Sequence, residues 1–406
     1  MQALAEAYVR LVLAVGQHDA AYVDAYYGPP EWRAEAAAVV VPLADLAAEA
    51  ARLRAALRTE LLADEGDADA AGRRRFLYGQ VVAVEARVAQ LSGQRFTFDE
   101  ESSLFYDVVA PTHSEAHFAA TVAELEGLLP GDGPLIERLD AFRAQFIIPP
   151  NRLAPVFEAA IARCRQQTAE WVSLPADESF SVEYVQNKPW SGYNWYQGGY
   201  RSVIQVNTDL PIYLDRAVDL AAHEGYPGHH LFNLLIEQQL VRERGWTEFT
   251  VYPLFSPESL IAEGTANFGI EVAFPGDSRV RFDRDVLLPL AGLPVAEADR
   301  YDQVMRLAAR LSYAGNEAAR QYLDGTIDRA AAATWLTRYA LMSPERADQR
   351  TRFIDVYRSY VINYNLGQDL VRAYVEAHGG TADNPSRRWQ VFLDLLQSPR
   401  LPSGLR

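Results

Sequence analysis

The chain has 406 residues, 49% of them hydrophobic, and a formal net charge of −16. This acidic balance argues against a nucleic acid or an anionic membrane surface as a partner. No run of about 18 apolar residues occurs, so no membrane-spanning helix is predicted. The single cysteine, Cys164, excludes an internal disulfide, and residues 1–22 lack the basic start and cleavage site of a signal peptide. We therefore expect a cytoplasmic protein.

The first 175 residues are predicted to form one helix after another. Apolar residues recur with the helical period, and clusters of Pro, Gly and Asp separate the periodic segments. The predicted helices are 1–16, a stretch ending at 62, 73–91, 99–108, 114–129, 135–146 and 153–172, with a turn at 26–32. We expect a mostly α-helical (α+β) fold, in which an N-terminal helical region, 1–175, continues into a region 176–406 as one structural unit.

Residues 178–207 are the one segment with a β-strand pattern. They are rich in Tyr, Trp, Val, Ser and Gly, and 200–207 alternate as a half-buried strand does. This strand precedes the stretch that holds most of the histidines. It is predicted to be either an edge to which an extended peptide adds as a further strand, or a plain structural hairpin.

The stretch Ala221–Asn233, AAHEGYPGHHLFN, contains His223, Glu224, His229 and His230, although the whole chain has only seven histidines. Zinc hydrolases of the H-E-x-x-H type hold the metal with two histidines one helical turn apart, beside a glutamate that acts as general base. Position 227 is proline here, so that spacing is absent and the second histidine comes six or seven residues after the first.

Helix geometry leaves two candidates for the second ligand. In a regular helix His230 would return to within about 20° of His223, but about 10 Å further along the axis. Pro227 must interrupt the helix, and Gly228 adds backbone freedom at that point. A bulge that absorbs two residues would restore the one-turn relation for His229. We therefore predict His229 as the ligand, with His230 as its competitor.

A catalytic zinc takes three protein ligands, and Glu263 is the candidate for the third. It lies in AEGTANFG, on a helix that Ser256 and Pro257 are predicted to begin. A carboxylate among apolar residues is costly to bury without a positive partner, which a metal would supply. The alternative is that Glu263 faces water or pairs with an arginine. Asn267 and Glu271 extend a polar face that either supports the ligands or faces solvent.

Glu224 follows the first ligand directly and is predicted to lie beside the metal, where it can act as general base on a water molecule. An attacked amide also requires a donor to its oxyanion. Tyr357, Tyr360 and Tyr364 form a stripe at helical spacing, which by itself is more typical of core packing than of a site.

HEGYPGHH followed by AEGTANFGIE resembles the HExxPGHH and EGxA signatures of a bacterial family known as domain of unknown function 885, which is placed among zincin metallopeptidases. NYNLG at 363–367 is similar to a late element of that family and puts Tyr364 on its tyrosine. The G-H-x-L order at 228–231 is also similar to carboxypeptidase Taq and oligopeptidase signatures, in which the histidine after glycine is the second ligand.

This resemblance implies a zinc-dependent peptidase on a zincin-like fold, and it agrees with the prediction from the residues. We expect His223, His229 and Glu263 to hold zinc, Glu224 to activate water, and Tyr364 or His230 to donate to the oxyanion of a peptide or small amide substrate. The competing hypothesis is a catalytically silent metal-binding or scaffold protein. Retention of Glu224 favours the enzyme, because a purely structural site has no use for an unligated base.

Overall fold

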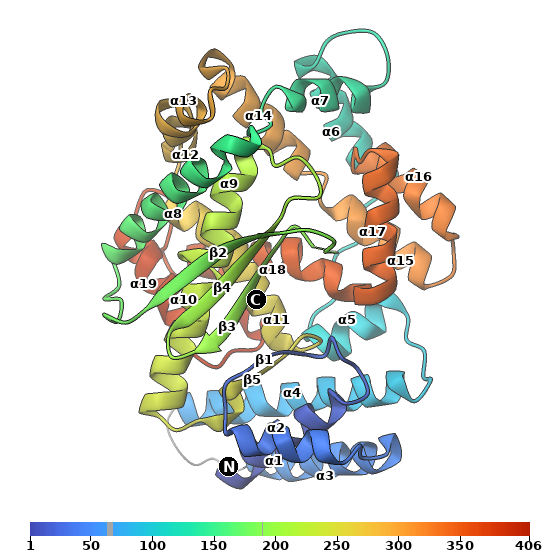
Figure 1. The fold of residues 1–406 in the computed structure, drawn as a ribbon. Coiled ribbons are helices and arrows are strands. Elements are labelled where there is room, and N and C mark those ends of the chain that lie inside the picture. Colours follow the sequence, from blue (N-terminus) through green and yellow to red (C-terminus); the bar gives the residue numbers. More distant parts are fainter. Residues whose placement is uncertain (63–67, 189) are drawn as a thin grey trace.

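We describe residues 1–62, 68–188 and 190–406 in a computed structural model of the protein (Figure 1). Most of these residues are helical, which confirms the predicted mostly α-helical class. The helices of the first region are α1 (Gln2–Val15), α2 (Pro30–Ala38), α3 (Leu43–Leu62), α4 (Ala68–Leu91), α5 (Phe98–Tyr106), α6 (Glu115–Leu128), α7 (Leu135–Ala144) and α8 (Leu153–Ala169).

The second region adds further helices around a small sheet. They are α9 (Leu214–Leu220), α10 (His229–Leu235), α11 (Pro257–Ala273), α12 (Ser278–Phe282), α13 (Leu288–Ala291), α14 (Ala298–Ala309), α15 (Tyr313–Leu323), α16 (Arg329–Tyr339), α17 (Pro344–Tyr357), α18 (Ile362–Ala377) and α19 (Pro385–Leu396). Helix α11 begins where the Ser256-Pro257 pair predicts, although the Ser256 hydroxyl makes no capping hydrogen bond.

The β-pattern of residues 178–207 corresponds to a three-stranded sheet in the middle of the molecule (Figure 1). Its strands are β2 (Ser179–Val185), β3 (Gly192–Gly198) and β4 (Arg201–Asn207), in the order β2–β4–β3. Strand β4 is parallel to β2 and antiparallel to β3. The strand predicted as a substrate edge is therefore the central one, with a neighbour on each side, and β3 lies at an edge instead.

A second, two-stranded sheet was not predicted. Strand β1 (Val23–Tyr26) pairs antiparallel with β5 (Val251–Pro253), just before α11 (Figure 1). The N-terminal helices α1 to α5 share one hydrophobic core with Leu260 of α11 and Leu366 of α18. The N-terminal region thus packs directly against the two helices that carry the predicted site.

Helices α11 and α18 cross so closely that no side-chain atom fits between their backbones at Gly264 and Gly367. A Cβ atom on Gly264 would lie 2.5 Å from the carbonyl carbon and oxygen of Gly367, and one on Gly367 would lie 2.7 Å from the carbonyl oxygen of Leu260. Neither position can hold a larger residue without separating the helices. Within the described part of the chain, no helix is both long enough and apolar enough to cross a bilayer.

Candidate metal centre

The backbone between the two predicted histidine ligands contains the two-residue bulge. His223 lies in a π-helical turn, 221–225, and His229 is the first residue of α10. The Gly228 amide donates to the carbonyl of Ala222, six residues back, where a regular helix would bond four residues back. The bulge accommodates two extra residues. His223 and His229, six residues apart along the chain, are therefore as close as residues one helical turn apart.

Gly228 and Pro227 are the residues that this bulge depends on. A Cβ atom on Gly228 would lie 1.9 Å from the carbonyl oxygen of His223, so no other residue fits there without moving the backbone. The ring of Pro227 contacts Gly269 of α11, at 3.1 Å from a Cβ built on that glycine. The chain therefore leaves the helix, packs against α11 and re-enters a helix at His229.

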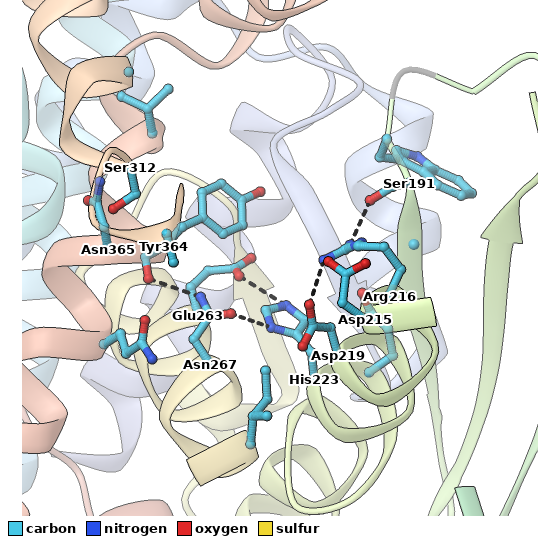
Figure 2. A pocket seen from close by; sticks show the side chains of 18 of the residues that line it. Ser191, Asp215, Arg216, Asp219, His223, Glu263, Asn267, Ser312, Tyr364 and Asn365 are labelled. Carbon is cyan, nitrogen blue, oxygen red and sulfur yellow. Dashed lines mark hydrogen bonds and ion pairs between the residues drawn. The ribbon is translucent and has the colours of Figure 1, made fainter. Parts of the chain in front are cut away.

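Three side chains converge on the cleft side of the bulge, and Figure 2 shows two of them, His223 and Glu263. The Nε2 atoms of His223 and His229 are 3.1 Å apart, and Glu263 Oε2 lies 3.2 Å from the first and 3.8 Å from the second. Zinc bonds of about 2.0–2.1 Å in a tetrahedron hold ligand atoms about 3.3 Å apart. The three atoms are therefore spaced as the ligands of one ion would be.

The hydrogen bonding of Glu263 also fits a cation. Its Oε1 accepts a hydrogen bond of 2.8 Å from the Tyr360 hydroxyl, whereas its buried Oε2 accepts none. A buried carboxylate oxygen without a hydrogen bond is costly. An ion between Oε2 and the two imidazole nitrogens would compensate all three atoms. Glu224 also offers an oxygen within 4.8 Å of the histidine nitrogens, so it lies beside the same point.

Asn267 of α11 determines which nitrogen of His223 is free. Its side-chain amide donates to the carbonyl of Tyr364 at 2.9 Å, so its Oδ1 must accept from Nδ1–H of His223, 3.0 Å away (Figure 2). In the neutral ring the lone pair of His223 then lies on Nε2, which faces Glu263 and His229. A partner that fixes the tautomer in this way is typical of metal-binding histidines.

Electrostatics at the cluster favour a positive charge. Burial alone would lower the pKa of His223, but the carboxylates of Glu263 and Glu224 raise it to about 9. The pKa of Glu263 is well below its ordinary value, because the two histidines outweigh the effect of burial. Without metal, the cluster holds a proton on His223, and a metal ion would have to displace it.

Glu224 is buried and backed by the edge strand. Gly192 of β3 leaves room for its carboxylate, since a Cβ atom there would lie 3.0 Å from Glu224 Oε1 and 2.5 Å from Leu220 Cδ2. The side chain of Asn194, also in β3, donates a hydrogen bond of 2.7 Å to the backbone carbonyl of Glu224. The predicted base therefore lies between the two histidines and a sheet edge.

His230 lies outside this cluster. It is fully buried, its Nδ1 is 2.8 Å from the Ser202 hydroxyl, and its Nε2 is 3.0 Å from Glu178 Oε2. The same carboxylate accepts hydrogen bonds from Tyr226 and Arg165. Both ring nitrogens are engaged on the far side of α10, so the structure removes His230 from the candidate ligands and from the candidate oxyanion donors.

The predicted tyrosine stripe is divided among three elements. Helix α17 ends at Tyr357, Tyr360 lies in a 3₁₀ turn (Arg358–Val361), and Tyr364 lies in α18. Tyr360 is thus the residue that binds Glu263. Tyr364 projects into the cleft beside Glu263, and its hydroxyl has no hydrogen-bond partner among the described residues (Figure 2). Burial, followed by the charge of Glu263, raises the pKa of Tyr364 well above its ordinary value.

The cluster opens into a cleft of about 1620 Å³. Part of its lining comes from the sheet edge β3 and the segment 223–229. Another part comes from α17 and α18. The N-terminal region contributes Asp24 of β1, which no motif signalled. Burial raises the pKa of Asp24 to about 7, although the nearby His229 lowers it. The structure thus adds an acid from a distant part of the chain to the mouth of the site.

No protein-family model and no curated protein matches this chain. A putative lipoprotein from Colwellia psychrerythraea aligns with a TM-score of 0.56 and 15% identity, over 92% of this chain and 70% of its own. An M32 carboxypeptidase from Deinococcus radiodurans R1 aligns with a TM-score of 0.49 and 13% identity, over 98% and 90%. A Pyrococcus furiosus carboxypeptidase aligns at 0.47 and 10%, over 99% and 91%. At such identities the comparison concerns the fold alone, and the large helical fold of this chain is similar to that of the Colwellia psychrerythraea protein. Membership of the family known as domain of unknown function 885 stays a prediction.

Proposed function

We propose that this protein is a zinc-dependent hydrolase that cleaves peptide bonds, with His223, His229 and Glu263 as the metal ligands. The observation that carries the proposal is the unsatisfied oxygen of Glu263, which faces two imidazole nitrogens at ligand spacing. Among the described residues, the ion-pair contacts of this oxygen are with the two histidines alone. The chemistry of the donors, two nitrogens and one carboxylate, is that of a catalytic zinc site with one open position.

A zinc ion held there would lower the pKa of a water molecule and polarise a substrate carbonyl. In the proposed mechanism Glu224 takes a proton from the attacking water and delivers it to the departing amine. Its carboxylate lies beside the cluster without being needed as a third ligand, since Glu263 fills that role. Gly192 leaves the space that this carboxylate occupies at the sheet edge, where a larger residue would displace it.

Tyr364 is the proposed donor to the developing oxyanion. A raised pKa keeps its hydroxyl protonated across the neutral range, and the hydroxyl faces the cleft without a competing acceptor. The substrate backbone would lie along β3, where an extended peptide can add as a strand. This assignment moves the predicted substrate edge from residues 200–207 to β3.

The test is Glu224→Gln, which keeps the shape of the side chain and removes its basicity. Wild-type protein purified without chelator should contain about one zinc per chain and cleave members of a mixed peptide library, read by mass spectrometry. The variant should keep its zinc and lose roughly 10²- to 10⁴-fold in rate. Equal cleavage by both proteins would contradict the role of Glu224. Zinc binding without any cleavage would favour the silent metal-binding protein, and failure to bind zinc at all would rule out both.

A further inference from the structure

Nine arginines line the cleft, and they fall into two groups. Six have a carboxylate within 4 Å, namely Arg216, Arg279, Arg306, Arg310, Arg372 and Arg388. The other three, Arg143, Arg346 and Arg350, have no such partner among the described residues. Unpaired cations inside a cleft are notable in a protein whose net charge is −16.

Arg350 is the one of the three whose charge acts on Tyr364, the proposed oxyanion donor. Its guanidinium stacks over the ring of Phe353 at 4.8 Å, and Gly315 leaves it space, since a Cβ there would lie 4.0 Å from Nη2. Phe353 in turn packs against the ring of Tyr364 at 6.4 Å, and Arg350 and Tyr364 influence each other's charge. The Nε atom of Arg350 is buried without a hydrogen-bond partner.

Arg346 and Arg143 continue the same wall away from the metal cluster. Arg346 lies one helical turn before Arg350 on α17, so both project from one face. Arg346 and Arg143 both stack on the ring of Tyr213, at 5.5 and 4.3 Å, and the Nε of Arg143 is also buried without a partner. The aromatic rings hold the planar guanidinium groups in place. The N–H donors of these groups have no acceptor among the described residues.

The charges around these residues leave the wall positive. Asp140 of α7 is the acid that both Arg143 and Arg346 influence, and it lies beyond ion-pair distance of either. Burial raises its pKa, which the two arginines partly offset. Glu345 also acts on Asp140, but it is exposed on the outer side of α17. Arg350 has no acid of this kind beside it, so one carboxylate balances at most one of the three cations.

We propose that this arginine wall, Arg143, Arg346 and Arg350, binds carboxylates of the substrate, so that the enzyme selects peptides that carry a negative charge on one side of the cleaved bond. The inference rests on the proposed peptidase function and specifies its substrate class. Arginine forms paired hydrogen bonds with a carboxylate, and a buried, desolvated guanidinium that lacks a partner is compensated when such a group enters. Arg350 takes the carboxylate nearest the reaction centre, and Arg346 with Arg143 takes one further out.

The carboxylate could be the C-terminal α-carboxylate or an acidic side chain, and matched peptides separate the two sources. Each library sequence is made with a free or an amidated C-terminus and, independently, with Glu or Gln next to the cleaved bond. We expect wild type to cleave the charged member of at least one pair on the order of 10-fold faster or more. The pair that shows the preference identifies the source.

Arg350→Gln should bring that preference close to 1, and Arg350→Lys should restore part of it, because lysine keeps the charge but not the paired donors. The matched control is Arg310→Gln, which removes a charge from the same cleft where Glu124 already balances it, 2.8 Å away. This control should keep the wild-type preference. Equal rates for charged and neutral peptides in wild type, or an unchanged preference in Arg350→Gln, would overturn the proposal.

A binding measurement keeps the proposal testable if no peptide is cleaved. Acetyl-glutamate, which carries two carboxylates, and its neutral analogue acetyl-glutamine α-amide, which carries none, are added to the protein as purified and after removal of metal by chelation. We expect acetyl-glutamate alone to raise the melting temperature in both forms, and the rise to be lost in Arg350→Gln. Stabilisation by both compounds, or by neither, would contradict carboxylate recognition. A protein that binds acetyl-glutamate through Arg350 but never cleaves peptides would contradict only the peptidase function.

Discussion

Two histidine–glutamate clusters lie on opposite sides of the same short helix, and they differ in how completely their polar atoms are satisfied. Around His230, both ring nitrogens and both oxygens of Glu178 have partners. Around His223 and His229, two ring nitrogens face one another and an oxygen of Glu263 has no hydrogen bond. The polar atoms of the first cluster are all satisfied, whereas the second leaves the carboxylate oxygen at which we propose a metal ion.

The contrast shows that residue type and sequence position do not separate a ligand from a structural histidine. His229 and His230 are adjacent, and a helix turns about 100° per residue, so they project in different directions. One reaches the cleft and the other reaches the sheet. Unsatisfied donors and acceptors in a buried place are the property that distinguishes the candidate site.

Replacing each histidine in turn tests whether His229, and not His230, binds zinc. His229→Gln should weaken zinc binding by about 100- to 1000-fold, since four-ligand sites bind with about 10–16 kcal/mol in all and one donor is removed. His230→Gln should leave zinc content unchanged and lower the free energy of unfolding. Metal analysis after dialysis and urea denaturation measure the two effects. The reverse outcome, in which only His230→Gln loses zinc, would show that the assignment of the clusters is wrong.

The second prediction concerns the pH dependence of the satisfied cluster. Burial alone would raise the pKa of Glu178, but hydrogen bonds from His230, Tyr226 and Arg165 lower it to about 2. A lowered pKa stabilises the fold above the ordinary value of 4.5 and loses this effect as the pH falls towards 2. Glu178→Gln should therefore cost roughly 2–3 kcal/mol at pH 7 and clearly less at pH 3.

Urea denaturation at several pH values measures this difference, and Glu183→Gln is the control. Glu183 is exposed on β2, in the same sheet, and accepts a hydrogen bond of 2.9 Å from Gln205. Its replacement should change stability by less than about 0.5 kcal/mol at either pH. A Glu178→Gln penalty that stays constant from pH 7 to pH 3 would contradict the lowered pKa.

The third prediction concerns the hydrogen bond between Asn267 and His223, and its expected effect on zinc affinity is smaller. Asn267→Ala removes the acceptor that holds the proton on Nδ1 of His223, so zinc affinity should fall about 10- to 100-fold while the three ligands remain. Competition with a zinc chelator measures the change. Gln368→Ala is the control, because Gln368 lies on α18 and bonds to Glu271 away from the ligands. Equal affinities for the Asn267→Ala variant and wild type would mean that another group fixes the tautomer.

Much of the helical framework was predictable, because each helix has its own apolar period and its own Pro, Gly or Asp boundary. Strand β1 was not, because it exists only through pairing with β5, more than 200 residues later. The same reason explains why residues 200–207 were assigned to an edge. Which strand is central depends on partners that the local pattern does not reveal.

The site divides in the same way. Pro227 and Gly228 were sufficient to infer the bulge, because both act on the local backbone. The sequence predicts Tyr360 and Tyr364 as one stripe, because nothing local marks the 3₁₀ turn that places Tyr360 against Glu263. The arginine wall had no sequence signal at all. It is recognised because no described carboxylate lies within ion-pair distance of the three arginines, which only the folded arrangement determines.

The backbone contact between Gly264 and Gly367 limits how this scaffold can be re-engineered. Glu263 immediately precedes one glycine, and Tyr364 lies three residues before the other, so the crossing fixes the positions of these two side chains together. An added methyl group on either helix would separate them before any substrate was bound. New specificities therefore have to be built by exchanging side chains on α17 and β3, while the α11–α18 pair is kept as an invariant block.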